Sequence, residues 1–373
     1  MKWRGLLLVA LLGVTLAGAE VRYSFHAPGL LPGAQARDFV DVAGITNSGV
    51  AIAYASTNDL REGGIVRVSA SSPPTYVGTV GGLGGVSLNG YIASPFEIDR
   101  GGGNFQRQGR LLSPDGTVVK AVDATLYDYA YATAVGEDGD TLGGFDYTDF
   151  GFTWITNPWI HKNGVKTILW EAGNSFISDI NAKGDLCGIK GGYRGRGMQG
   201  DLGAGSFYYK DGVYNLVGEA PGIPDSYSIC TSMNDDGIIA GYTWNADLTK
   251  QGIGFLLDTR SDTWSIHEGA FFFGINNKGD AVGIAGPTGA GALLGGTIVD
   301  LSAVVDPSVS ARYHLNKAWS INDNGVIAVE GWDKLDPHRR IQTFILTPVP
   351  EPATLAALGL GAFGLVRRRR KTA

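Results

Sequence analysis

The chain has 373 residues and a formal net charge of −6, and residues 20–348 alone carry 23 basic and 35 acidic residues, a net charge of about −12. An acidic surface repels phosphate backbones, so we expect no nucleic-acid partner. The two cysteines, Cys187 and Cys230, are too few for a disulfide framework, so a large core must stabilise the fold. Glycine is the compositional outlier, with 57 residues, roughly twice the usual share of ~7%.

Residues 1–19 have the pattern of a secretory signal peptide. Lys2 and Arg4 precede an apolar stretch at residues 5–16, and Ala17 and Ala19 are the small residues of a cleavage site. The apolar stretch is too short for a membrane span, which needs ~20 residues. We therefore expect an exported protein whose mature chain begins at Glu20.

Seven similar turn motifs recur through the body of the chain and predict its architecture. The copies are Asn47 and Gly49, Asn181 and Gly184, Asn234 and Gly237, Asn276 and Gly279, Asn322 and Gly325, and the degenerate pairs Leu88 and Gly90, and Glu137 and Gly139. Their glycines are 41 to 53 residues apart, with a mean of 46. Periods of ~40 to 50 residues are typical of propeller blades.

Each motif is predicted to be a tight hairpin turn. An asparagine side chain accepts hydrogen bonds from nearby backbone amides, and a glycine three positions later tolerates the left-handed conformation that follows a type I turn. Short apolar strands flank the turns, and two further strands follow in most repeats, as at residues 207–209 and 213–217. Four strands per repeat is the number in a propeller blade. We predict an all-β domain at residues 20–348, a single propeller of about seven blades.

A second set of glycines and the two ends of the domain add detail. Gly143, Gly188, Gly241 and Gly283 each follow a turn glycine by four residues, which suggests crowding where inner strands converge on a narrow channel. The last blade lacks one strand, whereas residues 21–25 alternate in polarity and have no earlier strand to pair with. We predict that residues 21–25 pair with residues 343–346 and close the ring as the outer strand of the final blade.

No catalytic motif is recognisable in the sequence. The histidines never have the spacing that sets two zinc ligands on one face, and no G-x-S-x-G nucleophile elbow occurs. Oxygen-rich turns such as residues 234–237 suggest calcium, but ordinary turn chemistry explains them and none follows the EF-hand pattern. Acids from different blades could still form a glycosidase pair. We expect no metal, no cofactor and a non-enzymatic role, with polysaccharide cleavage as the alternative.

Two groups of side chains leave alternatives open. Tyr54, Tyr242, Trp244 and Trp332 fall just beyond the second strand of their hairpins, towards one predicted rim. Exposed aromatic faces stack on sugar rings, so these are candidates for glycan binding, with core packing as the alternative. Cys187 and Cys230 belong to neighbouring repeats and can form a disulfide only if their Cα atoms lie within ~7 Å.

Residues 349–373 combine three ordered elements. Pro350, Glu351 and Pro352 precede an apolar run at residues 353–366, and Arg367, Arg368, Arg369, Arg370 and Lys371 follow it. The 14 residues of the run would rise about 21 Å as a helix, short of the ~30 Å hydrocarbon core of a bilayer. We expect a marginal membrane anchor whose cationic end stays in the cytoplasm.

This tail resembles the PEP-CTERM sorting signal, whose three elements are recognised by a membrane transpeptidase-like enzyme, the exosortase. The repeats, with a following aromatic residue and an Asp-Gly or Asn-Gly turn, look like extracellular HAF-type repeats that often accompany such tails. The resemblance implies a Gram-negative host, an exosortase partner, a membrane-anchored precursor and a mature protein at the cell surface or outside the cell. It also implies a binding or structural role among extracellular polysaccharides, with a carbohydrate-active propeller enzyme as the alternative.

Overall fold

The computed structural model describes residues 22–30, 39–56, 64–79, 84–99, 105–125, 129–149, 154–172, 174–190, 205–224, 226–245, 253–285 and 289–349. The expected signal peptide, the sorting residues Pro350 to Pro352, the apolar run and the terminal arginines lie outside these ranges. No helix within the described ranges is long and apolar enough to cross a membrane.

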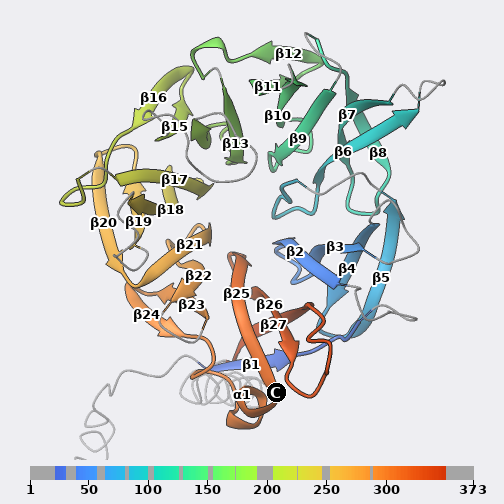
Figure 1. Cartoon of the computed structure of the whole chain (residues 1–373), viewed down its shortest axis with the longest axis vertical. Coiled ribbons are helices and arrows are strands. Elements are labelled where there is room, and N and C mark those ends of the chain that lie inside the picture. The colour runs from blue at the N-terminus through green and yellow to red at the C-terminus, as the bar shows by residue number, and fades with distance from the viewer. Residues whose placement is uncertain are drawn as a thin grey trace, which may run out of the picture.

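The described part of the chain is almost entirely β, with 27 strands in six hydrogen-bonded sheets around a common centre (Figure 1). One sheet contains β2 (Phe39–Ile45), β3 (Ala51–Ser56), β4 (Gly64–Ser69) and β5 (Ser72–Thr79). The next four-stranded sheets are β13 (Ser175–Ile180), β14 (Leu186–Lys190), β15 (Gly205–Lys210) and β16 (Val213–Val217); β17 (Ser226–Met233), β18 (Ile238–Asn245), β19 (Ile253–Asp258) and β20 (Thr263–Glu268); and β21 (Ala270–Ile275), β22 (Ala281–Ala285), β23 (Ala290–Leu294) and β24 (Thr297–Asp300). In each, the first strand lies nearest the centre.

The seven-stranded sheet divides into two parts. It contains β6 (Ile92–Asp99), β7 (Phe105–Leu112), β8 (Val118–Val122), β9 (Tyr129–Val135), β10 (Leu142–Asp149), β11 (Trp154–Lys162) and β12 (Val165–Ile168). A single parallel pair, Arg107 with Tyr129, joins β7 to β9. Residues 84–87 run beside β6, because the Gly84 N–H donates to the Ala93 carbonyl and the Ala93 N–H to the Gly85 carbonyl, both at 2.9 Å. This backbone takes the place of a first strand for β6 to β8.

The last sheet joins the two ends of the domain. Its order is β1 (Arg22–His26), β27 (Gln342–Val349), β26 (Ile327–Asp333) and β25 (Tyr313–Ile321). The antiparallel register pairs Arg22 with Val349 and Phe25 with Leu346, so the N-terminal strand lies outside the C-terminal one. The sequence did not indicate the short helices η1 (Trp170–Ala172) and α1 (Pro307–Arg312).

Buried apolar clusters lie between successive sheets. One cluster joins the sheets of β2 and β25 through Val40 and Val42 on one side and Ala328 and Ile345 on the other. Another, between the sheets of β13 and β17, contains both cysteines, which are free thiols. Burial raises the pKa of Cys230 to about 12 and that of Cys187 well above its usual value. Each Å² of apolar surface removed from water contributes about 25 cal/mol, so these contacts stabilise the whole arrangement.

The second set of glycines is crowded by bulged strands rather than by a central channel, which corrects the expectation from sequence. The pairings of β13, β17 and β21 shift register at a β-bulge. A Cβ at Gly188, Gly241 or Gly283 would collide with the backbone carbonyl of Phe176, Ile229 or Phe271 beside that bulge. A Cβ at Gly143 would instead lie 2.8 Å from the Ile180 side chain. Gly188, Gly241 and Gly283 therefore reject side chains because the neighbouring strand bends over them.

Candidate functional site at the inner turns

Seven tight turns follow the first strands or, in one case, residues 84–87, and we call them the inner turns: in the described chain they are residues 46–49, 87–90, 136–139, 181–184, 234–237, 276–279 and 322–325. In each, the glycine N–H donates to the carbonyl three residues earlier, at 2.9–3.4 Å. The seven glycines have φ between +66° and +88°, the left-handed region that glycine adopts without steric cost.

Three residues of the predicted repeat are out of register by one position. Thr46, not Asn47, is the first residue of its turn, because Thr46 Oγ1 accepts the Val50 N–H at 3.1 Å and the Thr46 carbonyl accepts the Gly49 N–H. Asn47 therefore occupies the second position. The same shift applies to Leu88 and Glu137. The spacing from Asn47 to Gly49 is two residues instead of three, and this difference was the signal for the shift.

Four buried asparagines at the first position connect neighbouring turns. The Oδ1 of Asn276 accepts the N–H groups of Lys278 (3.0 Å) and Asp280 (2.9 Å) in its own turn. The Nδ2 groups donate to the next turn: Asn181 to the Asn234 carbonyl (3.1 Å), Asn234 to Asn276 (3.0 Å), Asn276 to Asn322 (3.1 Å) and Asn322 to Thr46 (2.7 Å). The asparagine side chain carries an acceptor oxygen and a donor nitrogen on one short stem, so it can bond its own turn and the next turn at once, which explains why asparagine recurs here.

A second chain of hydrogen bonds runs through the next position of the same turns. In each bond a backbone N–H group donates to the side-chain Oδ1 of the next turn: Ala182 N–H to Asp235 (2.8 Å), Asp235 N–H to Asn277 (2.8 Å), Asn277 N–H to Asp323 (2.9 Å) and Asp323 N–H to Asn47 (3.1 Å). We did not select Asp235, Asn277 or Asp323 from the sequence. Their constant place after the repeated asparagine was the available signal.

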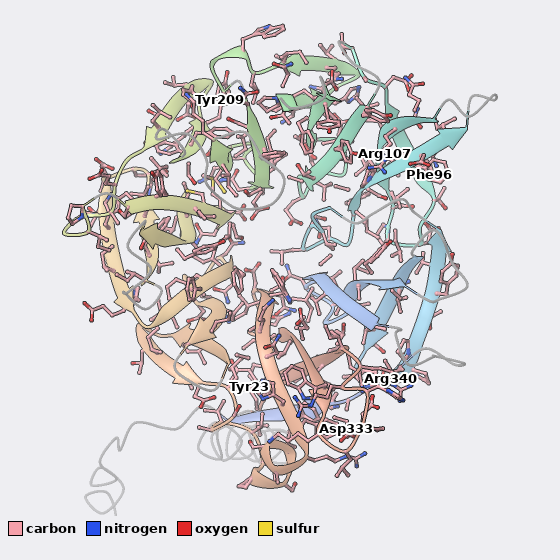
Figure 2. All side chains as sticks on the ribbon, viewed as in Figure 1. Tyr23, Phe96, Arg107, Tyr209, Asp333 and Arg340 are labelled. Atoms are coloured by element: carbon pink, nitrogen blue, oxygen red, sulfur yellow. The ribbon has the colours of Figure 1, made fainter. Side chains whose placement is uncertain are left out.

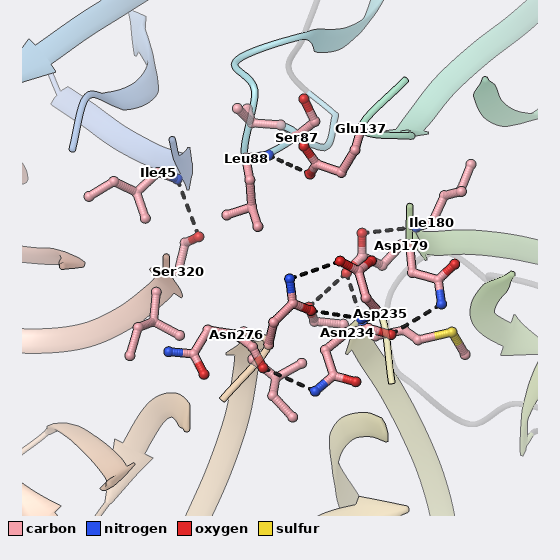
Figure 3. Close-up of a pocket in the computed structure, with 18 of the residues that line it drawn as sticks. Ile45, Ser87, Leu88, Glu137, Asp179, Ile180, Asn234, Asp235, Asn276 and Ser320 are labelled. Atoms are coloured by element: carbon pink, nitrogen blue, oxygen red, sulfur yellow. Dashed lines mark hydrogen bonds between the residues drawn. The ribbon is translucent and has the colours of Figure 1, made fainter. Parts of the chain in front are cut away.

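Glu137 provides the connection where the asparagines are missing. Its carboxylate accepts the N–H group of Leu88 (Figure 3). The same carboxylate accepts the Asn89 N–H at 2.9 Å, and the Glu137 carbonyl accepts Asn89 Nδ2 at 2.9 Å. The Asn47 N–H in turn donates to the Leu88 carbonyl at 2.8 Å. A degenerate copy of the repeat is thus still linked to its neighbour by a carboxylate.

The inner turns surround a small cavity of about 70 Å³, which we call the turn cavity. Glu137, Asp179 and Asp235 line it from three successive repeats (Figure 3). Asp179 accepts hydrogen bonds from the Ser232 hydroxyl (2.7 Å) and from the N–H groups of Met233 and Ile180 (both 2.9 Å). Asp179 belongs to no repeated sequence pattern and was not among the predicted site residues.

Burial dominates the electrostatics of the turn cavity. It raises the pKa of Asp179, although three hydrogen bonds oppose the shift, and the nearby charge of Asp235 adds to it. Burial also raises the pKa of Glu137 against the hydrogen bonds from Leu88 and Asn89, and the charges of Asp179 and Asp235 raise it further. Within the described ranges, no group of three or more His, Cys, Asp or Glu side chains could hold a metal ion.

The size and bonding of the turn cavity limit its chemistry. A volume of about 70 Å³ holds only a few water molecules, whereas pockets that enclose a ligand measure ~300 to 1,000 Å³. General acid–base catalysis needs a carboxyl group within reach of the substrate. Here the carboxylates of Glu137, Asp179 and Asp235 accept hydrogen bonds from the protein itself. The arrangement holds neighbouring sheets in register.

The candidate glycan-binding aromatics lie on three different sheets. Tyr54 packs on β3 against the apolar cluster of Ile52 and Ile65. Tyr242 on β18 lies edge-on to Phe271, with ring centroids 5.2 Å apart, and burial raises the pKa of its hydroxyl. Trp332 on β26 packs against His314, with ring centroids 4.1 Å apart and ring planes tilted by 31°. The Trp244 side chain lies outside what the structure describes.

Comparison with known proteins identifies the tail and the fold. A family model described as the PEP-CTERM protein-sorting motif matches residues 348–371. No curated protein sequence matches the chain. A solved oligogalacturonate lyase in complex with manganese is similar, with a TM-score of 0.54 and 11% identity over 89% of this chain and 97% of that one.

Two archaeal structures are also similar. The β-propeller domain of the Trilobed protease from Pyrococcus furiosus has a TM-score of 0.51 and 8% identity, over 83% of this chain and 93% of that one. An acylaminoacyl peptidase from Pyrococcus horikoshii has a TM-score of 0.51 and 10% identity over 87% of this chain, which spans only 54% of the peptidase. The chain therefore has a β-propeller fold, and its sorting motif marks an exported bacterial protein with a membrane-anchored precursor that an exosortase processes.

Proposed function

We propose that this chain is an exported protein of a Gram-negative bacterium with a non-catalytic binding or structural role at the cell surface or in the extracellular matrix, where it contacts polysaccharide. The match to the PEP-CTERM motif supports the export route. The resemblance of the inner turns to HAF-type repeats supports the extracellular setting, and the acidic charge argues against nucleic acid as a partner.

The proposed architecture is a seven-bladed propeller that β1 closes. Three observations support it: the seven inner turns, the antiparallel pairing of β1 with β27, and the buried cluster between the sheets of β2 and β25. The solved Trilobed protease domain is described as having an open velcro topology. A propeller fold alone therefore does not imply that a terminal strand closes the ring. Here the outer strand of the last sheet comes from the N-terminus.

The non-catalytic role rests on one observation. The three carboxylates of the turn cavity accept hydrogen bonds from the inner turns and from neighbouring strands, in a space of about 70 Å³. A glycosidase instead keeps two carboxyl groups ~5 to 10 Å apart around an accessible bond of the substrate. None of these three groups forms such a pair, because each accepts hydrogen bonds from the protein itself.

A polysaccharide assay tests the proposal. The purified mature protein is run through gels containing bacterial exopolysaccharides, and the length of each polymer is measured after incubation with the protein. We expect retarded migration and unchanged polymer length. Replacing Trp332 with alanine should reduce the retardation if that face binds sugar, whereas Trp170→Ala, at a 64% exposed tryptophan on η1, is the matched control. No retardation by any polymer would contradict polysaccharide binding.

The second candidate is a polysaccharide-cleaving propeller enzyme. The similarity to the solved oligogalacturonate lyase, which covers 97% of that protein, is the reason to retain it. Manganese is present in that structure, so the assay is repeated with added manganese and with a chelator. A shortened polymer, with activity lost in the chelator, would favour the enzyme over the binding protein.

A further inference from the structure

The sorting motif begins inside the folded domain. The PEP-CTERM match starts at residue 348, whereas β27 runs from Gln342 to Val349. Pro348 and Val349 therefore belong both to the motif and to the last strand of the propeller. Pro350 follows Val349 directly in the sequence, so no linker separates the recognised Pro-Glu-Pro from the fold.

The end of β27 is paired on one edge only. The register with β26 reaches Leu346, opposite Ile327, while the register with β1 continues through Thr347 and Pro348 to Val349. The Ser24 hydroxyl also donates to the Thr347 carbonyl, at 3.2 Å. Residues 347–349 are therefore bound to the sheet through β1.

The pairing orients the backbone groups of these residues. The Tyr23 N–H donates to the Val304 carbonyl at 3.0 Å and so points away from β27. Tyr23 and Pro348 are then a non-hydrogen-bonded pair, and the neighbouring pairs, Ser24 with Thr347 and Arg22 with Val349, carry the ladder bonds. Pro348 lacks an N–H group on the side away from β1, where the strand does not need one.

The prolines leave a single edge with amide donors. Pro348, Pro350 and Pro352 alternate in the sequence, so an extended chain here has no N–H donors on the edge away from β1. An enzyme that binds its substrate as an added strand needs donors and acceptors along one edge. The edge that offers them at residues 347–349 is the one that β1 occupies.

We propose that β1 masks the start of the sorting motif, and that the donor edge of residues 347–349 is the surface on which the membrane-bound processing enzyme docks after these residues separate from β1. The proposal rests on the processing by an exosortase. Two side chains anchor β1 in the core. Tyr23 (Figure 2) is 6% exposed, and the ring centroid of Phe25 lies 5.0 Å from that of Phe344. The last three pairs can thus open locally while β1 stays bound, as strand ends do at low cost.

A disulfide lock tests the masking. Ser24→Cys and Thr347→Cys replace a hydrogen-bonded pair whose Cα atoms lie ~5.5 Å apart, within the range of a disulfide. Full-length precursor with both changes is produced in cells that contain the processing enzyme, and its conversion is followed by immunoblot. We expect conversion to slow by about tenfold or more when the lock is oxidised and to recover with reductant, because local opening is prevented. Each single variant is the matched control.

A linker variant tests the same idea without constraining the strands. A short Gly-Ser linker between Val349 and Pro350 leaves residues 347–349 paired with β1 and separates them from the Pro-Glu-Pro. Because the enzyme would have to engage the docking edge and the Pro-Glu-Pro together, conversion should be slower than in the unmodified protein. If the precursors of the oxidised lock and of the linker variant were both converted at the same rate as the unmodified precursor, the proposal that β1 masks the motif would be overturned. If replacement of Pro350, Glu351 and Pro352 by alanine also left conversion unchanged, the processing route itself would fail, which is a separate result.

Discussion

At the scale of single residues, the buried asparagines explain why the repeat exists. Asn181, Asn234, Asn276 and Asn322 are at most 4% exposed, and each side chain both supports its own turn and bonds the next one. An unpaired buried polar group costs about 1–3 kcal/mol, so these positions tolerate few substitutions. The repeated asparagine therefore forms contacts between neighbouring sheets as well as within each turn.

Replacement of Asn276 by alanine tests this role. The change leaves the N–H groups of Lys278 and Asp280 and the carbonyl of Asn322 without their partner, so we expect a loss of at least ~2 kcal/mol in the free energy of unfolding. Asn324→Ala removes one exposed bond, to the Asn47 carbonyl, and should cost less than ~1 kcal/mol. Equal losses in urea titrations of the two variants would contradict the bridging role.

The turn glycines give a second prediction. Gly279 has φ of +80°, and no atom lies within 4 Å of the position that a Cβ would take, so alanine there should cost about 1 kcal/mol from the backbone alone. Gly218 also has open space around a Cβ but lacks the left-handed conformation, and its alanine variant is the control. Thermal melts compare the two. A Gly279→Ala variant as stable as the control would show that the conformation is not costly.

The raised pKa of Asp179 predicts a pH effect. A group whose folded pKa is raised contributes stability that is fully present below its unfolded pKa, ~4 for Asp, and is lost as the pH rises through the folded pKa. Asp179→Asn removes this titration. We therefore expect the stability of the variant relative to the unmodified protein to increase from about pH 4 to pH 7, measured by urea unfolding at each pH. A relative stability that is constant or decreases would contradict the assignment.

At the scale of elements, β1 connects the two ends of the domain. Tyr23 and Phe25 both contribute to the cluster that also contains Phe344 and Leu346. Deletion of residues 20–26 should therefore lower the melting temperature of the whole domain, because it removes the partner of β27 and exposes that core. If the deletion left the melting temperature unchanged and hydrogen exchange became faster only at residues 342–349, β1 would contribute only to local stability.

The sequence predicted the elements better than their irregularities. The period of the glycines predicted the hairpins, because a left-handed turn position restricts the residue type strongly. The pairing of residues 21–25 with the last strand followed from counting strands, and β1 lies there. The bulges in β13 and β17 were not predictable, since their backbone shift needs no special residue at the bulge itself. Thr46 was missed because a hydroxyl replaces the expected amide.

The candidate site was predicted in part. The turn residues were selected from sequence, but their hydrogen bonds to the neighbouring turns were not, because these connect residues 42 to 53 positions apart. Asp179 carries no pattern that distinguishes it from a surface carboxylate. Whether the aromatic candidates are available to a ligand depends on which face of the sheet each strand presents to solvent, and the sequence does not specify this. Tyr242, for example, packs against Phe271.

At the scale of the whole molecule, a propeller fold is combined with an export and sorting signal. The hydrogen-bonded inner turns hold the sheets of β13, β17, β21 and β25 to that of β2, and β1 holds the last strand. The sorting motif follows that strand without a linker. The stable part of the molecule and the processed part therefore meet at one strand, β27.

The central claim is that this stable domain is delivered outside the cell through its C-terminal motif. Replacing Pro350, Glu351 and Pro352 by alanine in the full-length protein should leave an unprocessed precursor in the membrane fraction, because the residues that the processing enzyme recognises are gone while the apolar run and Arg367 to Arg370 remain. Cell fractionation followed by immunoblotting measures this. The account predicts membrane-retained precursor in the variant and released mature protein in the unmodified strain, and equal release of mature protein from both would contradict it.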